Sequence, residues 1–184
     1  MKRIFIAVEI EPGATLLQLI SALKTGLKND NIKWVNTDNI HLTLSFLGDT
    51  EEEMIRSVSN MLKERCEGYG KFELVIEGLG IFRNLADPRV LWTGIKPSGE
   101  LVRLNEVIKN GLKQTGTKIE DRPFNPHITL GRIKSVRDNI LLASLLEKYH
   151  HSEMQRIFID KVVLFESILL NTGPVYEPIS IFKL

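Results

Sequence analysis

A four-residue pattern occurs twice in this chain, as His41-Leu42-Thr43-Leu44 and as His127-Ile128-Thr129-Leu130. Successive side chains of a β-strand point to opposite faces, so each copy would place its imidazole and hydroxyl on one face and its two aliphatic side chains on the other. Each copy therefore predicts a strand with one core face and one polar face. If a pseudo-twofold axis brings the polar faces together, two histidines and two threonines converge on one small volume.

The motif histidines stand at positions 41 and 127 of 184 residues, so their separation is close to half the chain. This spacing favours an internal duplication. A chain of this length, with 43% hydrophobic residues, can bury one sizeable core. We expect a single domain over residues 1–184, made of two pseudo-repeated halves of about 1–85 and 86–184.

The hydrophobic periodicity predicts a similar order of elements in both halves. Strands are expected at about residues 3–9, 32–35, 40–47, 71–77, 89–95, 127–130, 155–166 and 175–182. Helices are expected at about residues 14–28, 50–65, 100–114 and 138–148, and each motif strand follows a turn, at 36–39 and at 122–126. Strands joined by helices allow βαβ units, but the last two strands favour antiparallel pairing. We predict a bilobal α+β fold with mainly antiparallel sheets forming a central cleft and helices on the outside.

Finer details of two helices also follow from local patterns. Thr50 and Glu53 have the spacing of a capping box, which would start the second helix. In the helix at 138–148, the apolar pattern predicts that Ile140, Leu141 and Leu145 face the core together with Leu146. Trp34 and Trp92 lie in strand-like runs and are expected in the core, with the alternative that Trp34 flanks the cleft.

Charge and cysteine content exclude several classes of protein. The formal net charge is +1, from 24 basic and 23 acidic residues, so contacts with a nucleic acid would have to be local. The single cysteine, Cys66, excludes an internal disulfide framework and the usual cysteine-rich zinc sites. No stretch approaches the roughly 20 apolar residues of a membrane span. We expect a cytoplasmic monomer that does not bind membranes.

The residues of the repeated pattern suit the opening of a ribose cyclic phosphate. In that reaction an attacking water loses a proton and the leaving sugar oxygen gains one, so a base and an acid are needed on opposite sides of phosphorus. Two imidazoles with ordinary pKa values near 6.5 can fill both roles around neutral pH. The threonine hydroxyls can hold the non-bridging oxygens, where negative charge accumulates. One copy would be weak support, because a lone histidine is usually structural, but two copies in matching contexts favour acid/base chemistry.

A family resemblance rests on the extended motifs His41-Leu42-Thr43-Leu44-Ser45-Phe46-Leu47-Gly48 and Pro126-His127-Ile128-Thr129-Leu130-Gly131-Arg132, with Phe5-Ile6-Ala7 near the start. They resemble the two-histidine (2H) phosphoesterase superfamily, and within it the LigT-like RNA 2′,3′-cyclic phosphodiesterases, also called 2′-5′ RNA ligases. The resemblance covers essentially the whole chain. It implies hydrolysis of RNA ends bearing a 2′,3′-cyclic phosphate, or of related cyclic nucleotides, to 2′-phosphates. It also implies reversible 2′-5′ ligation and no metal or other cofactor.

The same resemblance implies roles for individual residues. His41 would be the proton donor to the leaving oxygen and His127 the proton acceptor that activates water, with Thr43 and Thr129 binding the phosphate. Phe46 and Arg132, each five residues after its histidine, are candidate substrate contacts. Strict alternation would put both on the aliphatic face unless the strand bulges, for which Gly131 is one place. A core position for Phe46 and a surface position for Arg132 therefore stay open.

Two other classes of function remain as alternatives. A module that binds RNA ends or nucleotides without turnover would use the same cleft, although arginine or lysine would serve phosphate binding as well as histidine. A metallohydrolase would need a third ligand of suitable spacing, which the sequence lacks. The adjacent His150 and His151 follow a helix end, where a solvated pair is favoured over a metal site.

Overall fold

A computed structural model describes residues 1–119, 123–171 and 173–184 of the chain. Within these residues, the strands form one sheet in the order β7-β4-β5-β6-β3-β1-β8-β9, with β2 beside β6. The strands are β1 Lys2–Glu9, β2 Asn31–Trp34, β3 His41–Thr50, β4 Phe72–Phe82, β5 Val90–Ile95, β6 His127–Ser135, β7 Glu153–Ile159, β8 Lys161–Leu170 and β9 Gly173–Lys183. The helices are α1 Ala14–Gly26, α2 Glu52–Cys66, α3 Gly99–Gln114 and α4 Asn139–Tyr149.

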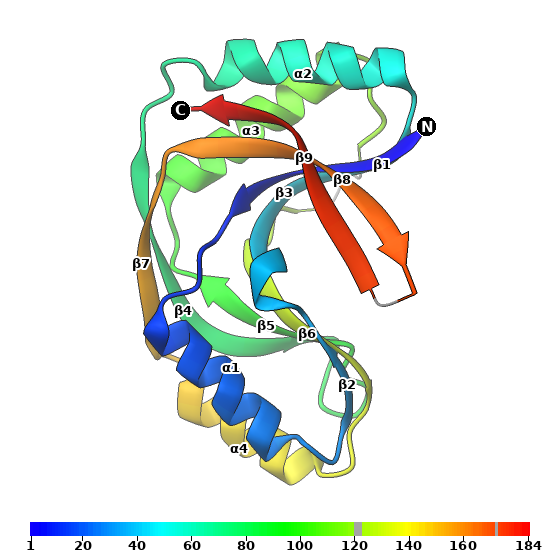
Figure 1. Cartoon of the computed structure of the whole chain (residues 1–184). Coiled ribbons are helices and arrows are strands. Elements are labelled where there is room, and N and C mark those ends of the chain that lie inside the picture. The colour runs from blue at the N-terminus through cyan, green and yellow to red at the C-terminus, as the bar shows by residue number, and fades with distance from the viewer. Residues whose placement is uncertain (120–122, 172) are drawn as a thin grey trace.

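The described strand pairs are all antiparallel, which confirms the predicted α+β class. Figure 1 shows the sheet curving from β7 to the β8–β9 hairpin, with α1 and α4 at one end and α2 and α3 at the other. Helix α1 contacts β7 and α4 contacts β4. At the other end, α2 contacts β8 and β9, and α3 contacts β3. This arrangement gives the molecule two lobes with the helices outside and the motif strands between them.

The two motif strands are neighbours at the middle of the sheet. Leu42 of β3 lies directly opposite Ile128 of β6. On one side of this pair, β1 lies between β3 and β8, and on the other side β5 lies between β6 and β4. Each side thus combines strands from both sequence halves, because β8 comes from the second half and β4 from the first. The two halves are interleaved in one continuous sheet.

The sheet has one face under the helices and one face that we call the open face. The large core combines buried residues of the helices with strand residues such as Ile4, Ile6 and Leu42. A second, small cluster consists only of strand residues: Phe5, Ala7, Val163 and Phe165, with Tyr176 packed against them. Because Phe5 and Ala7 alternate with Ile4 and Ile6 along β1, the small cluster lies on the opposite, open face.

Several expected boundaries need correction. The single strand expected at 155–166 is two strands, β7 and β8, which meet at Asp160 and pair with different partners, β4 and β1. The expected capping box is absent from α2: Glu51 is the N-cap residue and makes no side-chain cap bond. Thr50 is buried at the end of β3, where its hydroxyl donates to the carbonyl of Gly48 at 3.0 Å. The turn expected at 122–126 begins at Arg122, which lies outside the described residues.

The inner face of α4 also differs from the expectation. Ile140 is 84% exposed and Leu141 is also exposed, whereas Leu142 is fully buried. The aliphatic residues that pack on the core are Leu142, Leu145 and Leu146, which follow the helical spacing. The side chain of Asp138 caps the helix by accepting from the amides of residues 140 and 141, so these two occupy the solvated first turn.

Candidate active site

The register of the sheet brings the four motif side chains onto the open face. Leu42 and Ile128 are fully buried, while their neighbours in each strand, His41 and Thr43 or His127 and Thr129, are only partly buried. Because Leu42 and Ile128 are direct partners in an antiparallel pair, His41 stands beside Thr129, and His127 beside Thr43. The predicted convergence of two histidines and two threonines is therefore present in the fold.

Both histidine rings are oriented by the same local hydrogen bond. Nδ1 of His41 lies 2.7 Å from the backbone oxygen of Asn39, and Nδ1 of His127 lies 2.8 Å from that of Asn125. A carbonyl oxygen can only accept, so Nδ1 must carry the hydrogen in both rings. The neutral tautomer set in this way leaves Nε2 of each ring free to accept a proton, or to donate one when the ring is charged.

Aromatic side chains surround His41 on its own side of the site. The ring centroids of Phe5 and Tyr176 each lie 5.1 Å from that of His41, and Tyr176 meets the imidazole edge-on. Burial lowers the pKa of His41 below its ordinary value of 6.5, and the carbonyl of Asn39 acts in the opposite direction. The charge of Arg132, and that of His127 when its ring is protonated, also lower this pKa.

Different aromatic side chains surround His127. Phe82 meets it edge-on at a centroid distance of 4.6 Å, and Trp92 lies 6.5 Å away. The indole of Trp92 covers Gly80 and Gly94: a Cβ on Gly80 would lie 2.3 Å from the ring atom Cζ2, and one on Gly94 3.3 Å from Cζ3. The two glycines thus let the indole lie flat on the sheet. The expected core position of Trp92 is wrong, since the ring lies on the open face beside His127.

The other tryptophan and the histidine pair after α4 agree with their structural interpretations. Trp34 is partly buried and packs against the large core, as expected. His150 and His151 are exposed and contact each other, with Nδ1 of the first 2.9 Å from Nε2 of the second. Among the described residues, no group of three or more histidines, cysteines and acidic residues could hold a metal ion.

Bulges in both motif strands decide where Phe46 and Arg132 point. Opposite β1, the strand β3 has extra residues at Leu44 and Leu47, and opposite β5 the strand β6 has one at Leu130. An extra residue reverses the alternation that follows it, so an odd offset from the histidine no longer leads to the core. Phe46 is 42% exposed and Arg132 is exposed, which excludes the core position for Phe46. The bulge in β6 adjoins Gly131, where the sequence had allowed one.

Two further residues at the site have no motif of their own. Arg3 of β1 places its guanidinium carbon 4.9 Å above the centre of the Phe46 ring. Burial raises the pKa of the Tyr176 hydroxyl, whereas the charges of Arg132 and Arg3 lower it, so both guanidinium groups lie near this phenol. Neither residue carries a local sequence signal. In contrast, an asparagine two positions before each motif histidine, Asn39 and Asn125, repeats in the sequence and marks the carbonyls that orient the rings.

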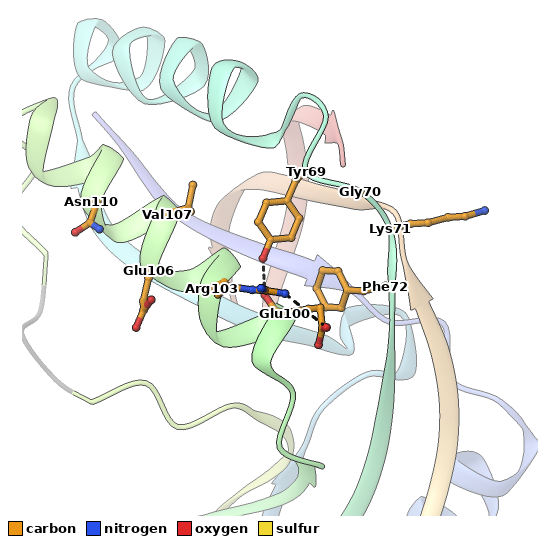
Figure 2. Close-up of a pocket in the computed structure, with 9 residues that line it drawn as sticks. All are labelled: Tyr69, Gly70, Lys71, Phe72, Glu100, Arg103, Glu106, Val107 and Asn110. Carbon is orange, nitrogen blue, oxygen red and sulfur yellow. Dashed lines mark hydrogen bonds and ion pairs between the residues drawn. The ribbon is translucent and has the colours of Figure 1, made fainter.

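Two surface pockets lie away from the motif residues. Figure 2 shows one of about 520 Å³ between α3 and the segment that joins α2 to β4, where the Tyr69 hydroxyl donates to the Glu100 carbonyl at 2.6 Å and Arg103 pairs with the Glu100 carboxylate. The other, of about 700 Å³, is lined by residues of 8–13 and 155–161 and by Thr37 and Asp38. Neither pocket is lined by a motif residue. The candidate site is therefore the open face at the β3–β6 pair, identified by its side chains.

Comparisons with known proteins agree with this architecture. A family model described as the 2′-5′ RNA ligase superfamily matches residues 12–167. A protein of Methanothermobacter thermautotrophicus named RNA 2′,3′-cyclic phosphodiesterase is 32% identical over 184 residues, covering 99% of this chain and 98% of its own length. The chain belongs to the 2′-5′ RNA ligase superfamily, which confirms the resemblance inferred from the two motifs.

Solved structures show the same fold. A crystal structure of a Thermus thermophilus protein matches with a TM-score of 0.80 and 25% identity, covering 99% of this chain and 97% of that one. Escherichia coli LigT complexed with 3′-AMP matches with a TM-score of 0.77 and 23% identity, covering 100% of this chain and 98% of that one. No helix among the described residues is long and apolar enough to cross a membrane.

Proposed function

We propose that this chain hydrolyses RNA ends bearing a 2′,3′-cyclic phosphate to 2′-phosphates, with His41 and His127 as the acid and base and without a metal ion. The observation that carries the proposal is the matched pair of Nδ1-to-carbonyl hydrogen bonds, which leaves two Nε2 atoms for proton transfer on one face of the sheet. Support also comes from relatives named RNA 2′,3′-cyclic phosphodiesterase at about a third identity over nearly the whole chain.

In the proposed reaction, the cyclic phosphate lies between the two imidazoles. His127 Nε2 takes a proton from water as the water oxygen bonds to phosphorus, and His41 Nε2 gives its proton to the 3′-oxygen as the phosphorus–oxygen bond breaks. The hydroxyls of Thr43 and Thr129 donate to the non-bridging oxygens. Neither hydroxyl has a hydrogen-bond partner among the described residues, so both are available to an anion.

The proposed acid role of His41 requires a charged imidazole, although burial lowers its pKa in the free protein. A bound phosphate places negative charge beside the ring and favours the imidazolium form. Substrate binding would therefore favour protonation of His41. With a 5′-hydroxyl in place of water as the nucleophile, the same acid and base would form a 2′-5′ phosphodiester bond and release the 3′-oxygen as a hydroxyl. We propose this 2′-5′ ligation as a second activity, reversible because the 3′-hydroxyl can attack the phosphorus again and expel the 5′-hydroxyl.

Substrate contact is proposed for Arg132 and Phe46. Arg132 is exposed and lies within electrostatic range of His41 and Tyr176, which suits a cation for the phosphate or base. Phe46 is an exposed aromatic ring next to the Arg3 guanidinium, which suits stacking on a base. These are local contacts, as a net charge of +1 requires, and they fit an RNA end or a related cyclic nucleotide. We further propose a cytoplasmic monomer that acts as one catalytic domain of two pseudo-repeated halves.

The test is an assay of the purified protein on an oligoribonucleotide ending in a 2′,3′-cyclic phosphate, with EDTA present. We expect turnover to a 2′-phosphate, and a loss of about two to four orders of magnitude in kcat for His41→Ala and for His127→Ala, each with an intact fold by circular dichroism. Binding without turnover by the unmodified protein would favour a binding module instead. Activity that EDTA abolishes and a divalent cation restores would favour a metallohydrolase.

A further inference from the structure

Asn39 makes two different contacts at the same time. Its backbone oxygen accepts the hydrogen bond from Nδ1 of His41 at 2.7 Å, and its side-chain Nδ2 donates to the backbone oxygen of Pro174 at 3.0 Å. Pro174 is the second residue of β9, which reaches the site from the far end of the sequence. One side chain therefore links the carbonyl that orients His41 to the last strand of the sheet.

Within its own turn, Asn39 is held by one backbone bond, from its amide to the carbonyl of Asn36 at 2.9 Å. The residues before β3 form a single 3₁₀ turn, Thr37–Asn39, whose capping residue Asn36 accepts from the amide of Asp38 at a long 3.4 Å. A 3₁₀ turn this short has poor hydrogen-bond geometry and adapts readily. The end of the turn is joined to the chain after β1, because the amide of Ile10 donates to the carbonyl of Ile40 at 3.1 Å. The side-chain bond to Pro174, which spans 135 positions, ties Asn39 itself to β9.

The same end of β9 also touches His41 directly. Tyr176 stands two residues after Pro174, and its ring meets the imidazole edge-on at 5.1 Å. Asn125, which supplies the matching carbonyl to His127, is exposed, and its side chain has no hydrogen-bond partner among the described residues. The link to a distant strand therefore distinguishes His41 from His127, although the local motif is the same.

We propose that Asn39 is a positioning residue, which acts through its side-chain bond to Pro174 to hold the carbonyl that selects the Nδ1–H tautomer of His41. This inference rests on the proposed function, in which Nε2 of His41 transfers a proton. When the link is lost, the carbonyl moves and the Nδ1–H bond weakens. The neutral ring then also populates the tautomer with hydrogen on Nε2, and the reacting nitrogen loses its fixed direction.

The experiment compares Asn39→Ala and Asn39→Asp with the unmodified protein. Aspartate keeps the size and turn preference of asparagine, but its carboxylate cannot donate to Pro174. We expect kcat to fall about tenfold to a hundredfold in both variants with KM changed less than threefold, because displacements of about 1 Å at reacting groups have effects of this size. The matched control is Asn171→Ala, an exposed asparagine in the β8–β9 hairpin, for which we expect an unchanged rate.

A readout independent of activity is the tautomer of His41, observed by two-bond ¹H–¹⁵N NMR correlation of the ring. We expect Nδ1–H in the unmodified protein and a mixture of tautomers in both Asn39 variants. The titratable and charged groups facing His41 are His127, Arg132 and Tyr176, and they are the same in all samples. The alanine variant keeps the backbone carbonyl of residue 39 but should lower the pKa of His41 by displacing this acceptor, whereas the new carboxylate should raise it, so a rate loss in both variants excludes an effect of pKa alone.

The outcomes separate this inference from the function on which it rests. If His41→Ala is inactive but both Asn39 variants keep the rate and the Nδ1–H tautomer, the positioning role is refuted and the proposed function stands. If His41→Ala itself keeps the rate, the proposed function fails, whatever Asn39 does. Loss of rate in Asn39→Ala together with an unchanged tautomer would also overturn the positioning role.

Discussion

Replacing Gly80 by alanine tests how closely the indole of Trp92, which lies beside His127, packs on the sheet. Gly80 of β4 lies directly opposite Trp92 of β5, so both project from the open face. An added Cβ would lie 2.3, 2.4 and 2.8 Å from three carbon atoms of the indole. Ordinary contacts of a Cβ lie between 3.4 and 4 Å, so the ring would have to move by about 1 Å.

The displaced indole has little space to enter. Its centroid lies 5.5 Å from that of Phe82, which in turn meets His127 edge-on at 4.6 Å. Overpacking of this kind typically costs about 1 to 3 kcal/mol in the free energy of unfolding. A shift of Trp92 and Phe82 would also move His127, and a misplacement of about 1 Å in a reacting group can reduce a rate by about a hundredfold.

We therefore expect Gly80→Ala to lower the free energy of unfolding by about 1 to 3 kcal/mol, measured by urea denaturation, and to lower kcat by about tenfold to a hundredfold. The matched control is Gly99→Ala at the start of α3, because a Cβ there would meet nothing within 4 Å. Alanine at such a position should leave the rate unchanged and leave stability equal or slightly higher.

A double variant isolates the clash itself. In a Trp92→Leu background the large ring is gone, so adding Gly80→Ala should cost less than about 0.5 kcal/mol further. If Gly80→Ala alone leaves both stability and rate unchanged, the flat packing of Trp92 on Gly80 is wrong. If it destabilises equally with and without Trp92, the cost arises in the backbone of β4 and not in the contact with the ring.

Two further predictions concern the histidines. A cyclic substrate with a bridging 3′-sulfur leaves as a stable thiolate and needs no proton, so it should rescue His41→Ala substantially and His127→Ala hardly at all in single-turnover assays; the opposite pattern would exchange the two roles. Because burial lowers the pKa of folded His41 below its unfolded value of about 6.5, the unfolded chain binds the proton more readily between the two values. The free energy of unfolding should therefore fall as the pH drops from 7 through this window, and urea denaturation of His41→Phe should show a shallower decrease; an equal decrease would contradict the effect of burial.

Local sequence patterns predicted most of the elements and the four central side chains of the candidate site. The alternation around His41 and around His127 depends only on the two-residue period of a strand, so it could be recognised without knowing the neighbouring strands. The helices α1, α2 and α3 agree with the expected ranges to within a few residues for the same reason, since their apolar spacing is local. The family was also identified at this level, because its motifs are short and their order is preserved.

Other features were decided by contacts between distant segments. The bulges that expose Phe46 and Arg132 arise from the pairing of β3 with β1 and of β6 with β5, which no single strand encodes. The break between β7 and β8 reflects two different partner strands, and it was missed because both strands share one apolar run. The apolar spacing of α4 was likewise ambiguous until its packing on the core selected Leu142.

The sequence by itself determined which side chains share a strand face, because that follows from covalent geometry over two to four residues. Only the tertiary structure decided that Tyr176 and Pro174 of β9 reach His41 and Asn39, and that Trp92 lies on Gly80 beside His127. These contacts join residues far apart in the chain, and they depend on which strands become neighbours when one interleaved sheet buries the apolar faces of both halves.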